Sequence, residues 1–322
     1  MYKGHGFFSN IIETFLWCMY CPDNNPDYEQ RGEVNMSEFK KELKEYANSI
    51  GVDLMGFAAK ERFGDVSPEE NPFSIFPEGN TVILLGKRIT RGALRGIEEG
   101  TNFSDYRTFG SSWLDDNSNS LMCYEITRYL EDRGYEAVPV FPNPVEAKGM
   151  GIRVKDGQPA PNVTPDFQYA VVACGLGEIG YHGEILTPEY GPRQRWQMII
   201  TDAVIEQDDI LQESICMQCG KCADVCPLGA IEGDKAIEIC GKKMNVGTVD
   251  YDRCRKCQNG AFPNRLLKNA KPDRLAALCV RTCIKELEKR NRVKNVFKNP
   301  FRKRKAWSID VYGKDAGVNC DD

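Results

Sequence analysis

The sequence predicts a layered α/β domain followed by a smaller, cysteine-rich domain. Hydrophobic residues make up 41% and charged residues 28% of the 322 residues, which is the balance of a chain that folds around a core. Before residue 206, helical patterns alternate with short apolar runs, as is typical of α/β layers. Nine of the 14 cysteines lie between Cys216 and Cys283. This change in composition places a domain boundary near residue 206.

The first expected elements are a helix and a buried strand. Ser37 is the expected N-cap of the helix, which runs until Gly51. The continuous apolar run over residues 81–86 predicts a strand that is buried on both faces. The apolar residues that recur at helical spacing in the first segment are Phe39, Leu43, Tyr46, Ala47 and Ile50.

Two further pairs of helix and strand follow. A long amphipathic helix is expected over residues 112–133, before Gly134 and a strand over 135–141. Another helix is expected from Thr164 to Gly175, and a strand over 196–205 closes the region. The apolar face of the long helix is expected to contain Leu121, Met122, Tyr124, Ile126, Tyr129 and Leu130. Strand order does not follow from these patterns.

Charge and hydropathy exclude several classes of protein. The net charge of -5 argues against a surface that binds nucleic acid throughout. No apolar stretch is long enough to cross a bilayer. Residues 1–20 carry no paired arginines and no small-residue cleavage site, so we expect a cytoplasmic protein. The basic segment 289–305 either packs on the acidic remainder or forms an electrostatic dock for RNA or an acidic electron donor.

The cysteines predict metal chemistry based on sulfur. In a reducing cytosol a chain of this size does not need a disulfide framework. His5 and His182 are the only histidines, which leaves little material for a histidine-based metal site. Thiolates that hold metal are therefore the leading explanation for the 14 cysteines.

One cysteine motif is specific for iron and sulfur. The run Cys216-Met-Gln-Cys219-Gly-Lys-Cys222-Ala-Asp-Val-Cys226-Pro227 has the C-x2-C-x2-C-x3-C-P spacing of bacterial ferredoxins. In that spacing the first three thiolates hold one cubane cluster and the fourth holds a second cluster. The sequence therefore predicts two 4Fe-4S clusters.

The remaining ligands should lie downstream. We expect Cys226 to join Cys240, Cys254 and Cys257, and we expect either Cys279 or Cys283 to complete the first cluster. The cysteine left over would be a buried, inert thiol. The other cysteines are expected to be structural or spare residues: Cys18, Cys21, Cys123, Cys174 and Cys320.

Several segments together resemble the shared core of reductive dehalogenases and epoxyqueuosine reductases. They are residues 173–180, 186–195 and 201–202, followed by the ferredoxin motif, in matching order and spacing over roughly residues 120–260. The resemblance implies a nitroreductase-like α+β domain that binds base-off cobalamin and a two-cluster ferredoxin-like domain. The domains would then be an N-terminal extension over 1–35, the corrinoid-binding domain over 36–205, the ferredoxin-like domain over 206–288 and a basic tail over 289–322.

The same resemblance suggests site residues. Arg193 and Arg195 are expected to meet the edge of the corrinoid or a substrate anion. Tyr135 best matches the tyrosine proton donor of the dehalogenases, although it also suits a half-buried strand position, and His182 is an alternative donor. The expected corrinoid-binding residues are Gly175, Leu176, Gly177, Gly180, Thr187, Tyr190 and Gly191, for whose glycines a simple tight turn is the alternative.

The expected function is that of a corrinoid-dependent reductase. Electrons would pass from a low-potential donor, a ferredoxin or flavodoxin, through two clusters to cobalamin and a small electrophile. Phe141 occupies the position of the acidic proton donor of epoxyqueuosine reductases, and residues 258–263 replace the second C-x3-C-P motif of dehalogenases. Two alternatives therefore stay open. One is an epoxyqueuosine reductase-like enzyme that uses the basic tail on tRNA, and the other is a non-catalytic protein that transfers electrons or reduces the corrinoid of a partner.

Overall fold

The computed structural model describes residues 35–147 and 151–318. Predictions for residues 1–34, including Cys18 and Cys21, and for Cys320 lie outside this part of the chain. The helices are α1 Met36–Ser49, α2 Arg95–Glu98, α3 Ser120–Glu131, α4 Phe167–Ala173, α5 Lys221–Asp224, α6 Tyr251–Arg255 and α7 Leu278–Lys289. The strands are β1 Leu54–Ala59, β2 Thr81–Arg88, β3 Ala137–Val140, β4 Glu178–Ile179, β5 Ile185–Leu186, β6 Gln194–Thr201, β7 Ile231–Ile239 and β8 Lys242–Val249.

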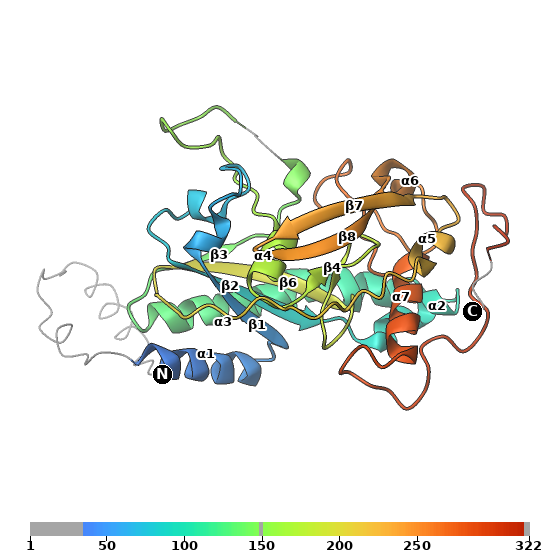
Figure 1. Ribbon diagram of the computed structural model, residues 1–322, viewed down its shortest axis with the longest axis horizontal. Helices are drawn as coiled ribbons and strands as arrows, with labels where there is room; N and C mark the ends of the chain where they lie inside the picture. Colours follow the sequence, from blue (N-terminus) through green and yellow to red (C-terminus); the bar gives the residue numbers. More distant parts are fainter. Residues whose placement is uncertain (1–34, 148–150, 319–322) are drawn as a thin grey trace, which may run out of the picture.

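A four-stranded sheet forms the centre of the fold, and its strand order is β1-β2-β6-β3 (Figure 1). Every pair in it is antiparallel, with Leu84 opposite Met198 in the central pair. The expected strand over residues 81–86 is confirmed as β2, which is buried from Thr81 to Gly86. Alternate residues of this strand face two separate hydrophobic cores, which explains why its sequence is continuously apolar.

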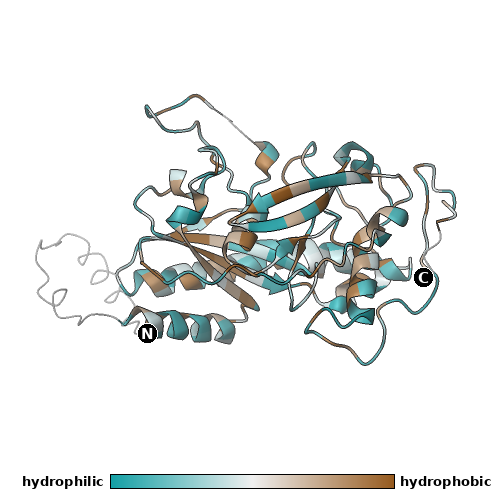
Figure 2. Cartoon of the chain, viewed as in Figure 1, coloured by the Kyte–Doolittle hydropathy of each residue, from teal (hydrophilic) through white to brown (hydrophobic). Residues whose placement is uncertain are grey.

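Helices α1 and α3 cover one face of the sheet (Figure 1). Phe39 and Leu43 of α1 and Ile126 of α3 pack there against Ile83 and Ile199 of the sheet. The outer side of α1 is hydrophilic, whereas the strands beside it are strongly hydrophobic (Figure 2). This amphipathic pattern holds the two helices on the sheet through apolar burial.

Helix α4 and the β7–β8 hairpin cover the opposite face (Figure 1). Val171 of α4 shares a core with Leu84 of the sheet and with Met244 and Val246 of the hairpin. Residues from both sides of position 206 thus contribute to one core. The domain boundary near residue 206 stays a prediction from composition.

Two helix starts differ from the expected ones. Helix α1 has Asn35 as its N-cap, because the Asn35 side chain accepts a hydrogen bond from the Ser37 backbone N–H; the assignment to Ser37 was wrong. Helix α4 begins at Phe167 rather than Thr164, because the Asp166 side chain accepts hydrogen bonds from the backbone N–H groups of Gln168 and Tyr169. In both helices a side chain other than the expected one accepts hydrogen bonds from the first backbone N–H groups, and this side chain sets the first residue of the helix.

The long helix expected over residues 112–133 is only partly α-helical. Residues Tyr106–Ser112 and Leu114–Asn119 have π-helical hydrogen bonding, and α3 follows them directly. Its buried face includes Met122, Ile126 and Leu130, as expected, but Leu121 and Tyr124 are each 60% exposed. The expected strands over 135–141 and 196–205 exist as the shorter β3 and the shifted β6.

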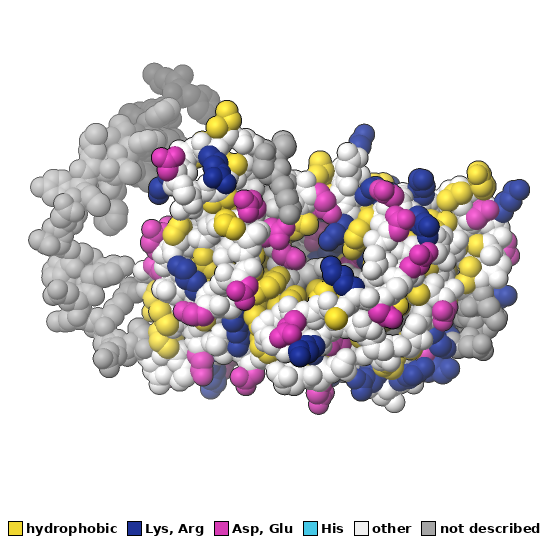
Figure 3. Space-filling model, turned by 45° about the horizontal axis from the view of Figure 1, so that its top comes forward, with side chains coloured by type: hydrophobic (Ala, Val, Ile, Leu, Met, Phe, Trp, Pro, Cys, Tyr) yellow, Lys and Arg dark blue, Asp and Glu magenta, His cyan; other side chains and the backbone are white. Residues whose placement is uncertain are grey.

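The basic segment 289–305 folds back on the body of the protein. Arg304 pairs with Glu99 at 2.7 Å, Lys294 pairs with Glu189 at 2.8 Å, and Arg302 pairs with the buried Glu98. Acidic and basic side chains are interspersed over the face drawn in Figure 3. Among the helices described here, none has the length and apolarity needed to cross a membrane.

Candidate functional site

Four cysteines surround one small cavity next to α5 and α7. Cys216, Cys219 and Cys222 come from the ferredoxin motif, and Cys283 comes from α7. The motif loop turns sharply because Gln218 and Gly220 adopt positive φ angles of 50° and 70°. Of the two candidates that the sequence left open, Cys283 lines this cavity and Cys279 does not.

Hydrogen-bond donors point at the sulfur of this set. The backbone N–H of Tyr181 donates to Cys216 Sγ at 3.4 Å, and the Gln218 side-chain amide donates to the same sulfur at 3.4 Å. Donors of this kind favour the thiolate and adjust the reduction potential of a cluster bound to it.

Four other cysteines form a second set. Burial raises the pKa of the Cys254 thiol to about 11, and the nearby thiolates of Cys226 and Cys257 add to the rise. Burial likewise raises the pKa of Cys279, with Cys226 and Cys257 again among its charged neighbours. The Ala230 N–H donates to Cys226 Sγ at 3.3 Å. Cys279 thus has Cys226 and Cys257 as neighbours, and Cys222 of the first set is also near it.

Cys240, which the sequence assigned to this second set, lies elsewhere. It occupies the turn between β7 and β8, where its thiol lies 3.8 Å from the Tyr169 hydroxyl and 3.5 Å from the Arg62 carbonyl oxygen. Strand β7 has nine residues, so its far end is roughly 25 Å from its start beside Cys226. The length of the hairpin separates Cys240 from the other ligands.

The donor chemistry of both sets suits iron-sulfur clusters. Each set supplies four thiolates, which is the ligand set of a cubane. In the described residues, no three His, Cys, Asp or Glu side chains converge closely enough to hold a single metal ion. Cys219 is exposed while Cys279 is buried, so the first set is nearer the surface than the second.

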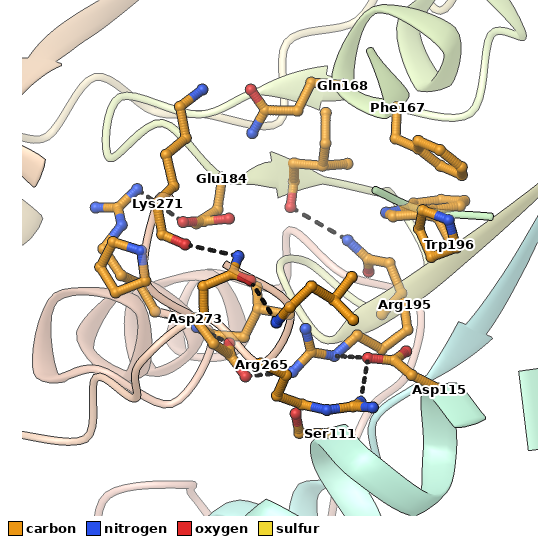
Figure 4. Close-up of a pocket in the computed structure, with 18 of the residues that line it drawn as sticks. Ser111, Asp115, Phe167, Gln168, Glu184, Arg195, Trp196, Arg265, Lys271 and Asp273 are labelled. Carbon is orange, nitrogen blue, oxygen red and sulfur yellow. Dashed lines mark hydrogen bonds and ion pairs between the residues drawn. The ribbon is translucent and has the colours of Figure 1, made fainter. Parts of the chain in front are cut away.

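A cavity of about 300 Å³ lies between the central sheet and the segment over residues 264–275. It is lined by aromatic and apolar side chains on one side, namely Phe141, Pro142, Phe167, Ile185 and Trp196. Charged side chains occupy two other positions: Asp115, Arg195 and Arg265 lie at one end, and Glu184 and Lys271 lie toward the other (Figure 4). The cavity is thus both polar and apolar, as ligand pockets usually are.

Arg195 is held at the cavity by a buried network. Its Nε donates to the Gly110 carbonyl oxygen at 2.9 Å, and its Nη2 donates to the Tyr106 hydroxyl at 2.9 Å and pairs with Asp273. Burial raises the pKa of Tyr106 well above its ordinary value, against the opposing charge of Arg195. Tyr106 therefore stays neutral and donates to Asp273 at 2.9 Å. This network fixes the direction of the Arg195 guanidinium.

Two carboxyl groups of the cavity hold protons more strongly than usual. Burial raises the pKa of Asp115, against the nearby charge of Arg195, and burial also raises the pKa of Glu184, against the charge of Arg274. A raised pKa keeps a carboxylic acid protonated at a higher pH, which suits Asp115 to deliver a proton inside the cavity, whereas Glu184 is held as the ion-pair partner of Arg274 at 2.7 Å.

The glycines expected to contact a cofactor instead pack against protein backbone. A Cβ on Gly175, whose φ is +69°, would lie 2.0 Å from the Asp209 carbonyl oxygen. A Cβ on Gly177 would lie 2.3 Å from the Leu186 carbonyl oxygen, and one on Gly180 would crowd the Leu186 side chain. Leu176 packs in the core below the sheet edge. None of the four lines the cavity.

The other expected cofactor residues also lie outside the cavity lining. Thr187 is buried and accepts a hydrogen bond from the Tyr190 N–H, and Gly191, with φ +61°, packs near α7. Arg193 points to the opposite side, where it donates to the Ile89 carbonyl oxygen and to Asn295 at 2.9 and 2.8 Å. Only Arg195 of the expected catalytic residues reaches the cavity.

Tyr135 is placed away from this site. Its ring packs 5.5 Å from the ring of Phe39, and its hydroxyl lies 3.9 Å from Met36 Sδ, against α1. This position agrees with the alternative that Tyr135 is a half-buried residue with a structural role. His182 is buried and lines the cavity of the first cysteine set. Burial lowers its pKa to about 3, so it is neutral rather than a source of protons.

Sequence reasoning missed the residues that build the cavity: Tyr106, Asp115, Glu184, Asp273 and Arg274. Asp273 and Arg274 are neighbours in the sequence, the other three lie in segments far from them, and together they form no motif. Glu184 lies between two of the segments that carry the family resemblance, 173–180 and 186–195, and had no signal of its own.

The cavity residues fit part of a corrinoid. The aromatic wall suits a flat macrocycle, and Arg195, Gln168 and Arg265 offer donors for carboxamide arms. The enclosed volume of about 300 Å³ is at the low end for ligand pockets, so a corrinoid would also use the open side of the cavity.

A family model described as "4Fe-4S binding domain" matches residues 210–232. Two kinds of curated protein are similar in sequence. An epoxyqueuosine reductase of Bacillus subtilis is 26% identical over 69% of this chain and 55% of its own length. A tetrachloroethene reductive dehalogenase of Dehalobacter restrictus is 39% identical over 60% of this chain and 30% of its own length. The chain is thus similar in sequence to proteins of both groups of reductases.

The chain spans between about a third and about half of the length of these curated relatives. Solved structures of the same two groups are also similar. An epoxyqueuosine reductase with a tRNA stem loop has a TM-score of 0.46 at 19% identity, covering 88% of this chain and 71% of its own. A catabolic reductive dehalogenase in complex with 3-bromo-4-hydroxybenzoic acid has a TM-score of 0.49 at 13% identity, covering 87% and 45%.

Proposed function

We propose that this protein is an iron-sulfur reductase that passes electrons through two 4Fe-4S clusters to a corrinoid and a small electrophile in the cavity. The observation that carries the proposal is the division of eight cysteines into two sets of four. The set containing Cys219 opens to the surface, and the set containing Cys279 is buried on the side of the cavity. Electrons would enter at the outer cluster and leave from the inner one.

The electron donor would meet the outer cluster at Cys219, which is exposed. Electron transfer between proteins requires a cluster near the surface, and the thiolate of an exposed cysteine brings it there. A low-potential ferredoxin or flavodoxin has the potential range needed to reduce such clusters.

The cavity residues would bind the corrinoid and prepare the substrate. Trp196 and Phe167 would contact the macrocycle, which when bound supplies a strongly reducing centre for two-electron reduction of an electrophile. Arg195 would orient an anionic or polar group of the substrate, because its guanidinium is already fixed by Asp273 and Tyr106. Asp115 would deliver the proton that completes the reduction.

The cavity volume of about 300 Å³ favours a small electrophile as substrate, such as an organohalide or an epoxide. The names of the curated relatives include both a dehalogenase and an epoxyqueuosine reductase, so both bond types are candidates.

The decisive experiment is anaerobic reconstitution of the full chain. We expect iron and sulfide at the content of two 4Fe-4S clusters and a change in the cobalamin spectrum when the corrinoid is added. Iron at one cluster or less, or an unchanged cobalamin spectrum with no corrinoid retained after gel filtration, would contradict the proposal.

The second candidate substrate is an epoxide carried on tRNA. It is favoured by the epoxyqueuosine reductase relative and by the exposed side chains of Lys298 and Lys303 in the basic segment. The third candidate is a protein that reduces the corrinoid of a partner enzyme. Turnover of a free organohalide without any partner would support the first candidate. Turnover restricted to tRNA, or only with a partner enzyme, would support the second or the third.

A further inference from the structure

Arg274 lies between the second cysteine set and the cavity. Its side chain is 1% exposed. At one end, Nη2 donates to the His182 carbonyl oxygen at 2.8 Å and pairs with Glu184 Oε1 at 2.7 Å. Glu184 lines the cavity, so this end of Arg274 is anchored to a cavity side chain.

The Cys254 and Cys279 thiols are neighbours of the same guanidinium. The Tyr251 ring packs 5.3 Å from the guanidinium carbon and closes this side from solvent. The charged groups that face Arg274 are therefore Glu184 and these thiolates.

Two donors of Arg274 have no protein acceptor. Nε and Nη1 are buried and make no hydrogen bond within the described residues. A buried, unsatisfied donor costs on the order of 1–3 kcal/mol, and more when it is charged. An acceptor that the protein part lacks is therefore expected at this position. The sulfur atoms of a cluster held by Cys226, Cys254, Cys257 and Cys279 would supply that acceptor.

We infer that Arg274 is a positioning residue that binds the inner cluster through Nε and Nη1, raises its reduction potential, and connects it to Glu184 in the cavity. The inference rests on the proposed function and adds to it. Reduction adds one negative charge to the cluster, and a buried cation stabilises that charge, so the potential rises. The negative charge of Glu184 partly offsets the positive charge of Arg274, and the ion pair between them fixes the guanidinium beside the cluster.

The test measures the potentials of both clusters by an electron paramagnetic resonance redox titration of the reconstituted full chain, without corrinoid or substrate. We expect Arg274→Met to lower the potential of one cluster and leave the other unchanged. Arg274→Lys should give a smaller downward shift because it retains the charge but loses the planar donors. Glu184→Gln should shift the same cluster in the opposite direction.

Arg253→Gln is the matched control. Arg253 precedes the ligand Cys254 but is 48% exposed and pairs with Glu232 and Asp250, so its loss removes a charge near the cluster without removing a buried donor. Equal potentials in Arg274→Met and wild type, or a shift equal to that of Arg253→Gln, would overturn the inference. If Arg274→Met fails to incorporate iron, the opposite shifts of Arg274→Lys and Glu184→Gln still decide the question.

Failure of the proposed function gives a different result. In that case the wild-type chain would hold fewer than two clusters or would not bind cobalamin. Clusters that are present in the wild type but do not respond to Arg274 would refute the inference alone.

Discussion

Cys240 and Cys283 show how strongly the position of a single residue depends on the elements around it. Both were candidate ligands by spacing. Cys283 lies on α7 and faces the motif loop, whereas Cys240 lies at the far turn of a nine-residue hairpin strand beside Tyr169. The Cys283 thiol is thus placed beside the other candidate ligands, whereas the Cys240 thiol contacts only neighbouring protein groups.

The two cysteines make a matched pair for measuring iron content. We expect Cys283→Ala to lose about half of the iron, because one of the two proposed clusters would lose a ligand. Cys240→Ala should retain full iron content, since its thiol lies far from both sets. Iron and sulfide analysis after anaerobic reconstitution checks this. Equal losses in the two variants would refute the ligand sets described here.

The glycines near residue 177 can be tested as packing residues. Gly177→Ala places a Cβ 2.3 Å from the Leu186 carbonyl oxygen, so the backbone must shift. We expect a loss of about 1–3 kcal/mol in the free energy of unfolding, already in protein that has no corrinoid. Gly92→Ala is the control, because its Cβ would meet nothing within 4 Å. Urea unfolding measures both; an unchanged Gly177→Ala midpoint would argue for a cofactor role instead.

At the scale of elements, side-chain caps decided where helices begin. Apolar periodicity predicted α1 correctly, and Phe39, Leu43 and Ala47 are buried as expected. It could not separate Asn35 from Ser37 as the cap, because both residue types accept hydrogen bonds from backbone N–H groups. The π-helical turns before α3 had no signal in the periodicity, since one extra residue per turn only rotates the apolar face.

The cap assignment of α1 predicts unequal effects for two neighbouring substitutions. Asn35→Ala should lower the free energy of unfolding by about 1 kcal/mol, because the Ser37 N–H loses its acceptor. Ser37→Ala should cost clearly less, since the Ser37 side chain donates to Asn35 and caps nothing itself. Chemical denaturation compares them. A larger effect for Ser37→Ala would restore Ser37 as the cap.

At the scale of the whole molecule, Glu98 joins three distant parts of the chain. Its carboxylate pairs with Arg281 of α7 at 2.7 Å and with Arg302 of the basic segment, and all three side chains are buried. Arg302 and Arg304 thereby bring the basic segment onto the acidic surface around α2. This position agrees with the alternative that the segment packs on the acidic remainder, and its exposed lysines stay available to a partner.

Neutralising Glu98 should destabilise the whole protein. Glu98→Gln leaves Arg281 and Arg302 without a charged partner in a buried site, so we expect a loss of about 3–5 kcal/mol. The control Glu99→Gln removes a more exposed acid that pairs with Arg95 and Arg304, and should cost no more than about 1 kcal/mol. Thermal unfolding of both variants measures this. Similar melting temperatures would show that the buried pair does not hold the segment in place.

The sequence by itself determined the features that depend on neighbours along the chain. The spacing of Cys216, Cys219, Cys222 and Cys226 specified iron-sulfur chemistry because cluster ligation is local, and the apolar run of β2 specified a buried central strand because both of its faces are covered. The glycine stretch was predicted to contact a flat cofactor, with a tight turn as the alternative, and the glycines contact protein atoms instead.

Only the tertiary structure decided which distant groups meet. It placed Cys279 beside Cys226, Cys283 beside Cys222, and Arg274 between the inner cysteines and Glu184. It also replaced Tyr135 by Tyr106 as the neighbour of Arg195. These pairings depend on how the hairpin, α7 and the 264–275 segment pack on the sheet, and side-chain burial at such contacts carries no periodic signal along a single chain.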